Sequence, residues 1–303
     1  MTAQKLVDAH ILLKISGGRY KPDDIFLLVE GITDKEFVER LNIKKVQCIA
    51  IGTILEADCA LKGNKEKPNN KKVILDVIKG KTGQNCYGLV DKDFDSERRI
   101  QEYHKNVLVT PTHDLETLLL STDKKIFEAP EMIKESFDIA LYVAYLVGCV
   151  DKYLLNNGYR YRKLQNDDLE KIITTPVKKL TEITDLTELV NFDNLIDLSI
   201  DESDKTGIRR KIKQEHILDV EIDDIGEKEL YETANGHDIA NIIRLLCKDC
   251  ISDFIKGHNH FRSTKLDRNI EFAIIGKYDL SMFKICKLYK EMSKKGLKPT
   301  NIF

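Results

Sequence analysis

The sequence of 303 residues has no apolar run long enough to cross a bilayer, which takes roughly 20 residues in a helix. Its longest apolar-leaning stretch, IALYVAYLVGCV from Ile139 to Val150, has a length typical of a buried helix. The opening residues, MTAQKLVDAH, lack the basic region and apolar core of a signal peptide. We therefore expect a cytoplasmic protein without a membrane segment.

Other absences narrow the class of protein further. The seven cysteines form no spaced disulfide framework, which is typical of reduced thiols in a cytosol. The formal net charge of -2 argues against whole-molecule attraction to nucleic acid or acidic membranes, although a local basic patch would not register in that sum. There is no G-x-S-x-G motif and no Walker A sequence, so we expect neither a serine hydrolase of that type nor ATP hydrolysis by a P-loop.

The first part of the chain, from Ile25 to about Leu120, alternates short β-branched runs with amphipathic helical stretches. This alternation predicts βαβ units and a mainly parallel sheet. Beyond Ser121, longer segments of helical period dominate. We therefore predict an α/β domain over residues 1–125 and a mainly α-helical domain over 126–303. Strands are expected at IFLLVE (25–30), VQCIAI (46–51), CYGLV (86–90) and NVLVTP (106–111), and helices at TDKEFVERL (33–41), KKVILDVIKG (71–80) and DLETLLL (114–120).

The turn after the first predicted strand has a clear local pattern. Gly31 lets the backbone turn sharply out of the strand. Thr33, followed three residues later by Glu36, has the spacing of a capping box. We therefore expect the first helix to start at Thr33.

Carboxylates lie at the ends of three of the predicted strands. The strand-end acids are Glu30 as the last residue of the first strand, Asp91, Asp93 and Asp95 after the third, and Asp114 and Glu116 after the fourth. Because ligands bind at the carboxyl ends of parallel strands, we expect these side chains to share one edge of the sheet. Taken singly, an aspartate after a strand is also a common turn former or helix cap. Three converging acidic ends repel one another unless a positive group lies among them, so the pattern predicts a divalent metal site.

The same residues resemble a known family. VEG after a strand and DKD at the end of a later strand resemble the TOPRIM domain, the metal-binding fold of topoisomerases, primases and OLD-family nucleases. THDLETLLL and NGHDIANIIRLL resemble recurring patterns of a TOPRIM-like family of unknown function. That family includes the TOPRIM subunit that is paired with an ABC-type ATPase in PARIS anti-phage defence systems. The resemblance runs over nearly the whole chain.

The resemblance implies roles for individual residues. It implies a Rossmann-like TOPRIM fold in which Mg²⁺ or Mn²⁺, as two ions, assists phosphodiester hydrolysis. Glu30, Asp91 and Asp93 would be catalytic. The implied metal ligands are Glu30 with Asp34 for one ion, Asp91 with Asp93 for the second ion or as a bridge between both, and a third acidic element of Asp114 and Glu116 after Thr112. Asp114 or Glu116 has the alternative role of capping the next helix at its positive end.

Basic and aromatic residues allow two interpretations each. Lys71 and Lys72, in a lysine-rich stretch between the acidic elements, and Lys92, inside the DKD motif, are candidates for binding substrate phosphates. The alternative is a solvated loop and helix face. The same choice applies to the cluster Arg209, Arg210, Lys211 and Lys213. In YRYRK, Tyr159 and Tyr161 alternate with basic residues, and the two interpretations are base stacking with cations on the nucleic-acid backbone, or an ordinary amphipathic surface strand.

A zinc site is the less favoured interpretation of the cysteine–histidine stretch CKDCISDFIKGHNH. Cys247 and Cys250 lie in a strong helical pattern, and the spacing to His258 and His260 lacks a second paired knuckle. In NGHD, Asn235 or Asp238 is a typical helix cap. Because NGHD recurs in the resembled family, a role of His237 and Asp238 in orienting the active site or a partner surface stays open.

The sequence therefore favours a metal-dependent nuclease. The resemblance implies a toxic effector of prokaryotic defence that a partner ATPase controls, acting on RNA, tRNA included, or on DNA. The alternative is a catalytically silent TOPRIM module that binds a partner protein or nucleic acid, and a lesser one is a phosphotransfer or primase-like enzyme. Whether the chain forms a homodimer is left open.

Overall fold

The computed structural model describes residues 2–16, 18–19, 21, 23–62, 68–80, 85–127, 131–174, 188–201, 203, 205–218, 221, 224–247 and 266–302. The chain divides into two compact units. Unit 1 comprises Met1–Leu115 and Tyr278–Phe303, and unit 2 comprises Glu116–Lys277. This division corrects the predicted boundary at residue 125, because the last segment of the chain returns to the α/β unit.

Unit 1 contains a parallel sheet of four strands in the order β2-β1-β3-β4. The strands are β1 (Ile25–Val29), β2 (Val46–Ala50), β3 (Cys86–Val90) and β4 (Val107–Val109). The last three residues of β1, β2 and β3 are buried, as expected for a parallel sheet that is covered on both faces. The prediction of an α/β fold with a parallel sheet is confirmed.

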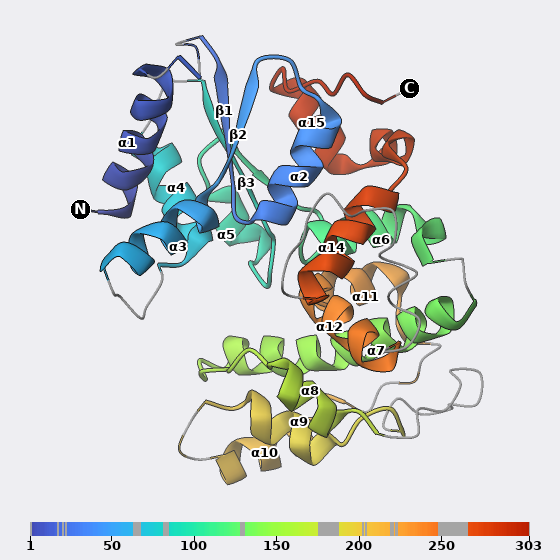
Figure 1. Cartoon of the computed structure of the whole chain (residues 1–303). Coiled ribbons are helices and arrows are strands. Elements are labelled where there is room, and N and C mark those ends of the chain that lie inside the picture. Colours follow the sequence, from blue (N-terminus) through green and yellow to red (C-terminus); the bar gives the residue numbers. More distant parts are fainter. Residues whose placement is uncertain are drawn as a thin grey trace. The chain divides into compact units, whose positions relative to one another are not determined.

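Helices cover both faces of this sheet. Figure 1 shows α1 (Ala3–Ser16), α3 (Ile51–Lys62) and α4 (Asn70–Gly80) on one side of the strands, with α2 (Ile32–Leu41) and α15 (Lys287–Lys294) on the other. Two short elements, α5 (Glu97–Gln101) and η5 (Leu280–Ile285), complete unit 1.

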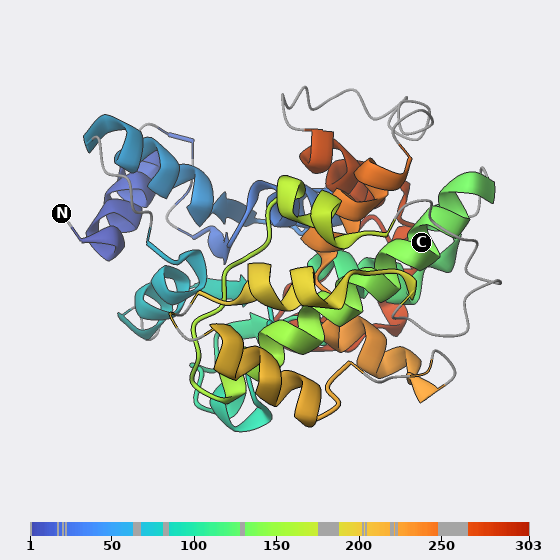
Figure 2. The same cartoon turned by 90° about the horizontal axis from the view of Figure 1, so that it is seen from below.

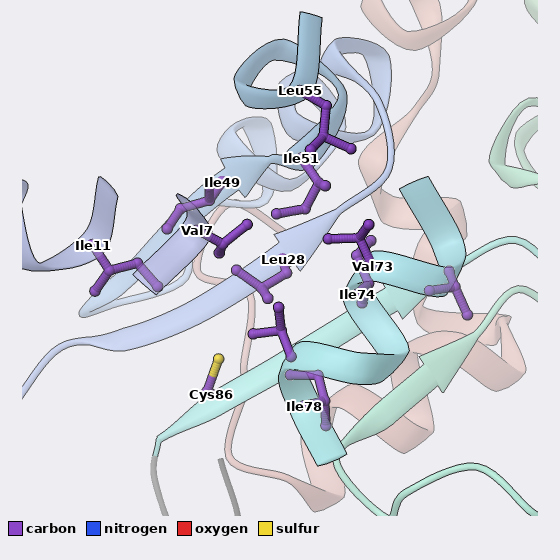
Figure 3. Close-up of a cluster of buried hydrophobic side chains, with 12 residues drawn as sticks. Val7, Ile11, Leu28, Ile49, Ile51, Leu55, Val73, Ile74, Ile78 and Cys86 are labelled. Atoms are coloured by element: carbon purple, nitrogen blue, oxygen red, sulfur yellow. The ribbon is translucent and has the colours of Figure 1, made fainter. Parts of the chain in front are cut away.

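The first face carries a continuous apolar core. Figure 3 shows side chains from α1, α3 and α4 gathered over the strands, among them Val7, Ile11, Ile51, Leu55, Ile74 and Ile78 against Leu28, Ile49 and Cys86. A Cβ atom at Gly88 of β3 would lie 2.6 Å from Cγ2 of Ile74, so the glycine permits this close packing of α4 on the strand. Each such buried aliphatic side chain contributes roughly 1.5–3 kcal/mol to folding.

The other face explains why the end of the chain belongs to unit 1. Phe37 of α2 is fully buried and meets the rings of Tyr278 and Phe283 edge-on, at centroid distances of 6.1 Å and 5.1 Å. The Arg40 guanidinium also donates a hydrogen bond to the backbone carbonyl of Tyr278. Burial of these rings fixes the C-terminal segment against α2.

The start of α2 corrects the predicted capping box. The helix is N-capped at Gly31, and Asp34 rather than Glu36 reaches back, its Oδ2 accepting a hydrogen bond from the Gly31 N–H at 2.7 Å. The N-cap therefore lies two residues before Thr33, and the helix begins at Ile32. The reason is that β1 ends at Val29, which leaves only Glu30 and Gly31 for the turn.

Unit 2 is built mainly from helices. They are α6 (Leu115–Thr122, whose first residue belongs to unit 1), η1 (Lys124–Phe127), α7 (Glu131–Asn156), α8 (Asn166–Ile172), α9 (Phe192–Ser199), α10 (Lys205–Gln214), α11 (Glu227–Thr233), α12 (Gly236–Leu246) and α14 (Leu266–Lys277). Figure 2 shows α7 as a long helix in green, and it packs against α9, α11 and α12. Gly148 permits the contact with α11, because a Cβ atom there would lie 2.1 Å from the Thr233 carbonyl oxygen. None of the described helices is both long and apolar enough to cross a membrane.

Candidate metal centre

The strand order of unit 1 creates a topological switch point. β1 and β3 are neighbours, but the chain leaves β1 toward β2 and leaves β3 toward β4, in opposite directions along the sheet. In open α/β sheets, ligands bind in the crevice that such a reversal leaves at the carboxyl ends of the strands. Glu30 directly follows β1 and Asp91 directly follows β3, so both predicted residues lie at this switch point.

The Glu30 side chain joins the two strand ends. Its Oε1 accepts a hydrogen bond from the Asp91 N–H at 3.0 Å. Its backbone carbonyl accepts hydrogen bonds from the Gly52 N–H at 2.9 Å and from the Asn70 amide at 3.1 Å. These contacts fix the turn after β1, and they hold the carboxylate over the end of β3.

The surroundings of Glu30 disfavour the ionised form of its carboxyl group. Burial raises its pKa to about 7, the hydrogen bond from the Asp91 N–H opposes that rise, and the charges of Asp93 and Asp34 add to it. The nearby Lys71 ammonium lowers the pKa but does not cancel these effects. A cation placed at this carboxyl would therefore be bound favourably, because it would stabilise the ionised form.

The loop after β4 lies against the loop after β3. Asp91 Oδ1 accepts a hydrogen bond from the Leu115 N–H at 3.2 Å, at the first residue of α6. Asp93, which has a left-handed backbone with φ of 49°, donates its N–H to the His113 carbonyl at 2.8 Å. Asp114, between those two partners, is 2 % exposed, and its Oδ2 lies 3.3 Å from His113 Nδ1. The Asp91 carboxylate thus contacts the start of α6.

Lys71 occupies a position that the sequence did not predict. Its side chain is buried, and its ammonium contacts Asp93 Oδ2 at 2.9 Å and Asp95 Oδ2 at 2.5 Å. It also donates to the backbone carbonyls of Asp91 at 2.5 Å and Lys92 at 3.2 Å. The predicted phosphate-binding lysine therefore faces the carboxylates of its own sheet edge, whereas Lys72 is exposed.

The Asp95 side chain is held by contacts with other side chains of unit 1. Its side chain is 7 % exposed and accepts a hydrogen bond from the Tyr103 hydroxyl at 2.6 Å, in addition to its ion pairs with Lys71 and Arg99. Burial alone would raise the pKa of Asp95, but the contacts with Lys71 and Tyr103 outweigh it and lower the pKa. These contacts anchor the β3–α5 loop.

Glu116 belongs to a different cluster, which lies in unit 2. Among the described residues, the three side chains whose ligand atoms all lie within 4.8 Å of one another are Glu116, His237 and Glu271. Burial lowers the pKa of His237, but the charges of Glu271 and Glu116 raise it to about 10. The sequence signal for this cluster was NGHD, whereas nothing local marked Glu271. The predicted ligands in unit 1 are all among the described residues, and they lie at one edge of the sheet. No three of these described residues have ligand atoms that all lie within 4.8 Å of one another.

The structure also shows contacts of the other basic and cysteine clusters that the sequence singled out. Arg209 and Lys213 pair with Asp197 and Asp193 of α9, which agrees with the interpretation as a solvated face. The Lys211 ammonium donates to the Tyr159 hydroxyl at 2.9 Å. The buried thiol of Cys247 lies at the end of α12, whereas Cys250, His258 and His260 lie outside the described residues.

No protein-family model matches the sequence, and no curated protein matches it significantly.

Proposed function

We propose that the chain is a metal-dependent nuclease that hydrolyses phosphodiester bonds at the β1–β3 switch point. The observation that carries this proposal is the joining of Glu30 to the end of β3 through the Asp91 N–H, in the crevice where open α/β sheets bind ligands. A phosphodiester is anionic, so an acidic crevice would repel it without a bound cation.

The residues at this edge fit a divalent ion. Glu30 and Asp91 lie at the switch point, and Asp34 reaches the same turn by accepting a hydrogen bond from the Gly31 N–H. Carboxylate oxygens are the ligands that Mg²⁺ and Mn²⁺ prefer. We assign Glu30, Asp34 and Asp91 as ligands, with Asp93 adjoining them. When bound, such ions supply Lewis-acid polarisation of the phosphate and an activated water.

The remaining residues prepare the site. Lys71 pairs with Asp93 and Asp95, and it thereby fixes the loop that carries Asp91. The hydrogen bond from Leu115 orients the Asp91 carboxylate. The exposed Lys72, with Lys92, is our proposed contact to substrate phosphates.

The finer parts of the proposal rest on the sequence resemblance. They are a TOPRIM identity, a role as toxic effector of anti-phage defence, control by an ABC-type ATPase, and RNA such as tRNA, or DNA, as substrate. We also propose a cytoplasmic location, which the cysteine pattern rather than the resemblance supports.

The first test is cleavage of labelled DNA and of total tRNA by the purified chain with Mg²⁺ or Mn²⁺. We expect Glu30→Gln and Asp91→Asn to reduce the cleavage rate by about 10³-fold, which corresponds to about 4 kcal/mol of transition-state stabilisation. Glu39→Gln is the matched control, because Glu39 is an exposed carboxylate of α2 that pairs with Lys35. Equal cleavage by all four proteins would show that the activity comes from another site or from a contaminant.

One observation favours the silent-module alternative. The buried Lys71 ammonium already supplies a positive charge to the acidic edge without any metal. Calorimetric titration with Mg²⁺ and Mn²⁺ distinguishes the two. The silent module is favoured if the chain cleaves nothing and if Glu30→Gln and Asp91→Asn do not change its metal binding.

A further inference from the structure

Unit 2 brings together a nitrogen donor and two oxygen donors from three helices. Glu116 lies in the first turn of α6, His237 in the first turn of α12, and Glu271 in the middle of α14. Their ligand atoms all lie within 4.8 Å of one another. These residues are far apart in the sequence, so only the packing of the helices creates the group.

The supporting backbone is held firmly. α12 packs against α14 and α7, and its residues Ile239 and Ile243 are fully buried. The Asn235 side chain caps α12 and accepts hydrogen bonds from the His237 N–H at 2.9 Å and the Asp238 N–H at 3.4 Å. The imidazole is therefore presented from a fixed helix end, as a binding site requires.

The two carboxylates of the group carry more negative charge than the single imidazole can offset. Glu116 is 2 % exposed and Glu271 is 5 % exposed, and burial of two carboxylates is unfavourable without compensation. His237 Nδ1 lies 2.5 Å from Glu271 Oε1, and a protonated imidazole offsets one negative charge of the two. A divalent ion bound with a neutral imidazole would offset both.

A further buried carboxylate lies in the same unit. Asp151 of α7 is 8 % exposed, and its Oδ1 has no hydrogen-bond partner within the part of the chain that the structure describes. It interacts electrostatically with Asp238, the residue after His237. The Lys163 ammonium acts in the opposite sense to Asp238 on Asp151 and also acts on His237, so it offsets part of the negative charge in this region.

The group also has access to solvent. The His237 side chain is 40 % exposed, whereas Glu271 is buried beside it. Three protein ligands with one exposed side leave a coordination position for water, as in open zinc sites.

We propose that Glu116, His237 and Glu271 form a divalent metal site within unit 2, and that it takes a first-row transition ion such as Zn²⁺ or Mn²⁺. The imidazole selects this class, because Mg²⁺ and Ca²⁺ prefer oxygen ligands alone. The site shares none of its ligands with the proposed nuclease centre, which uses oxygen donors of unit 1. Its ion joins α6, α12 and α14, and it stabilises unit 2 whether or not the chain cleaves nucleic acid.

The test uses the full chain with Glu30→Gln and Asp91→Asn already introduced, so that the carboxylates of unit 1 contribute little. After treatment with a chelator, we would titrate this protein with Zn²⁺, Mn²⁺ and Mg²⁺ by calorimetry. We expect one Zn²⁺ or Mn²⁺ ion per chain and much weaker binding of Mg²⁺. Co²⁺ should give the visible absorption bands of a nitrogen- and oxygen-ligated ion.

Single substitutions then locate the ion. His237→Gln and Glu271→Gln should each weaken Zn²⁺ binding by at least about tenfold. His216→Asn is the matched control, because His216 is an exposed histidine of unit 2 with a left-handed backbone that asparagine tolerates. Circular dichroism of the metal-free variants checks that each still folds, and Glu116→Gln gives a third ligand variant if one does not.

The outcomes separate this proposal from the nuclease proposal. Zn²⁺ binding that is lost in His237→Gln and retained in His216→Asn supports the site, even if the wild-type chain cleaves nothing. The proposal is overturned if the protein without the unit 1 carboxylates binds neither Zn²⁺ nor Mn²⁺. It is equally overturned if His237→Gln and Glu271→Gln fold and bind as tightly as their parent.

Discussion

Unit 1 and unit 2 both bring carboxylates together, but they do so by different means. In unit 1, Glu30 and Asp91 meet because they directly follow two neighbouring parallel strands. In unit 2, Glu116 and Glu271 meet because helices from distant parts of the sequence pack together. A sheet therefore converts a local sequence pattern into a shared edge, whereas a helical bundle conceals which side chains will meet.

The two clusters also differ in the cation that accompanies them. The acidic loop of unit 1 holds a buried lysine ammonium, which has ion pairs with Asp93 and Asp95. Unit 2 uses His237, a half-exposed imidazole that can exchange a proton for a metal ion. We therefore expect Lys71 to be a permanent structural cation and His237 to be a replaceable one.

The largest effect should come from removal of the fixed cation. Lys71→Met keeps most of the side-chain volume but leaves Asp93 and Asp95 without the ammonium, so we expect the free energy of unfolding of unit 1 to fall by about 3 to 5 kcal/mol. Hydrogen exchange of β1 and β3 amides reports this change. The exposed neighbour offers the control: Lys72→Met should change stability by less than about 0.5 kcal/mol. Equal effects at both positions would contradict the assignment of Lys71 as a structural cation.

Metal addition should stabilise unit 2 by a somewhat smaller amount. Zn²⁺ at about 100 times its dissociation constant should add about 2.7 kcal/mol to the free energy of unfolding. Hydrogen exchange of α12 amides measures it, in wild type and in His237→Gln. A Zn²⁺ effect of the same size in His237→Gln would place the ion elsewhere.

The pH dependence of unit 1 should reveal the strained carboxyl. Burial raises the pKa of Glu30 from 4.5 to about 7, so folding favours its protonated form. Its favourable contribution is complete below pH 4.5 and is lost as the pH rises through about 7. In the metal-free protein at pH 8, Glu30→Gln should therefore stabilise unit 1 by on the order of 2 kcal/mol. Urea titrations at pH 4.5 and pH 8 test this, and a gain that is equal at both values would refute the pKa assignment.

The smallest effect should come from the cap of α2. Asp34→Ala removes the acceptor of the Gly31 N–H, and loss of such a cap costs roughly 1 kcal/mol. Thr33→Ala should cost less if the helix starts after Gly31, as the structure has it. Thermal denaturation of both metal-free variants compares the two, and a larger loss at Thr33 would restore the predicted capping box.

The sequence by itself determined the strands of unit 1 and the acids that follow them. CYGLV was predicted as a strand and is β3, and KKVILDVIKG was predicted as a helix and forms most of α4. These predictions are confirmed, because hydrophobic periodicity and β-branched residues determine secondary structure within a few neighbouring residues. The convergence of Glu30 and Asp91 followed, because parallel neighbouring strands end at the same edge.

Only the tertiary structure decided the rest. Lys71 was predicted either to bind substrate phosphates or to lie on a solvated face. Its burial depends on how α4 packs on β3, where Gly88 leaves room for the helix. The helical pattern gave no means to see that Glu271 would meet His237, because contacts between helices depend on crossing geometry rather than on local spacing. The return of Tyr278 and Phe283 to α2 likewise followed from burial of aromatic rings far apart in the chain, which no local pattern encodes.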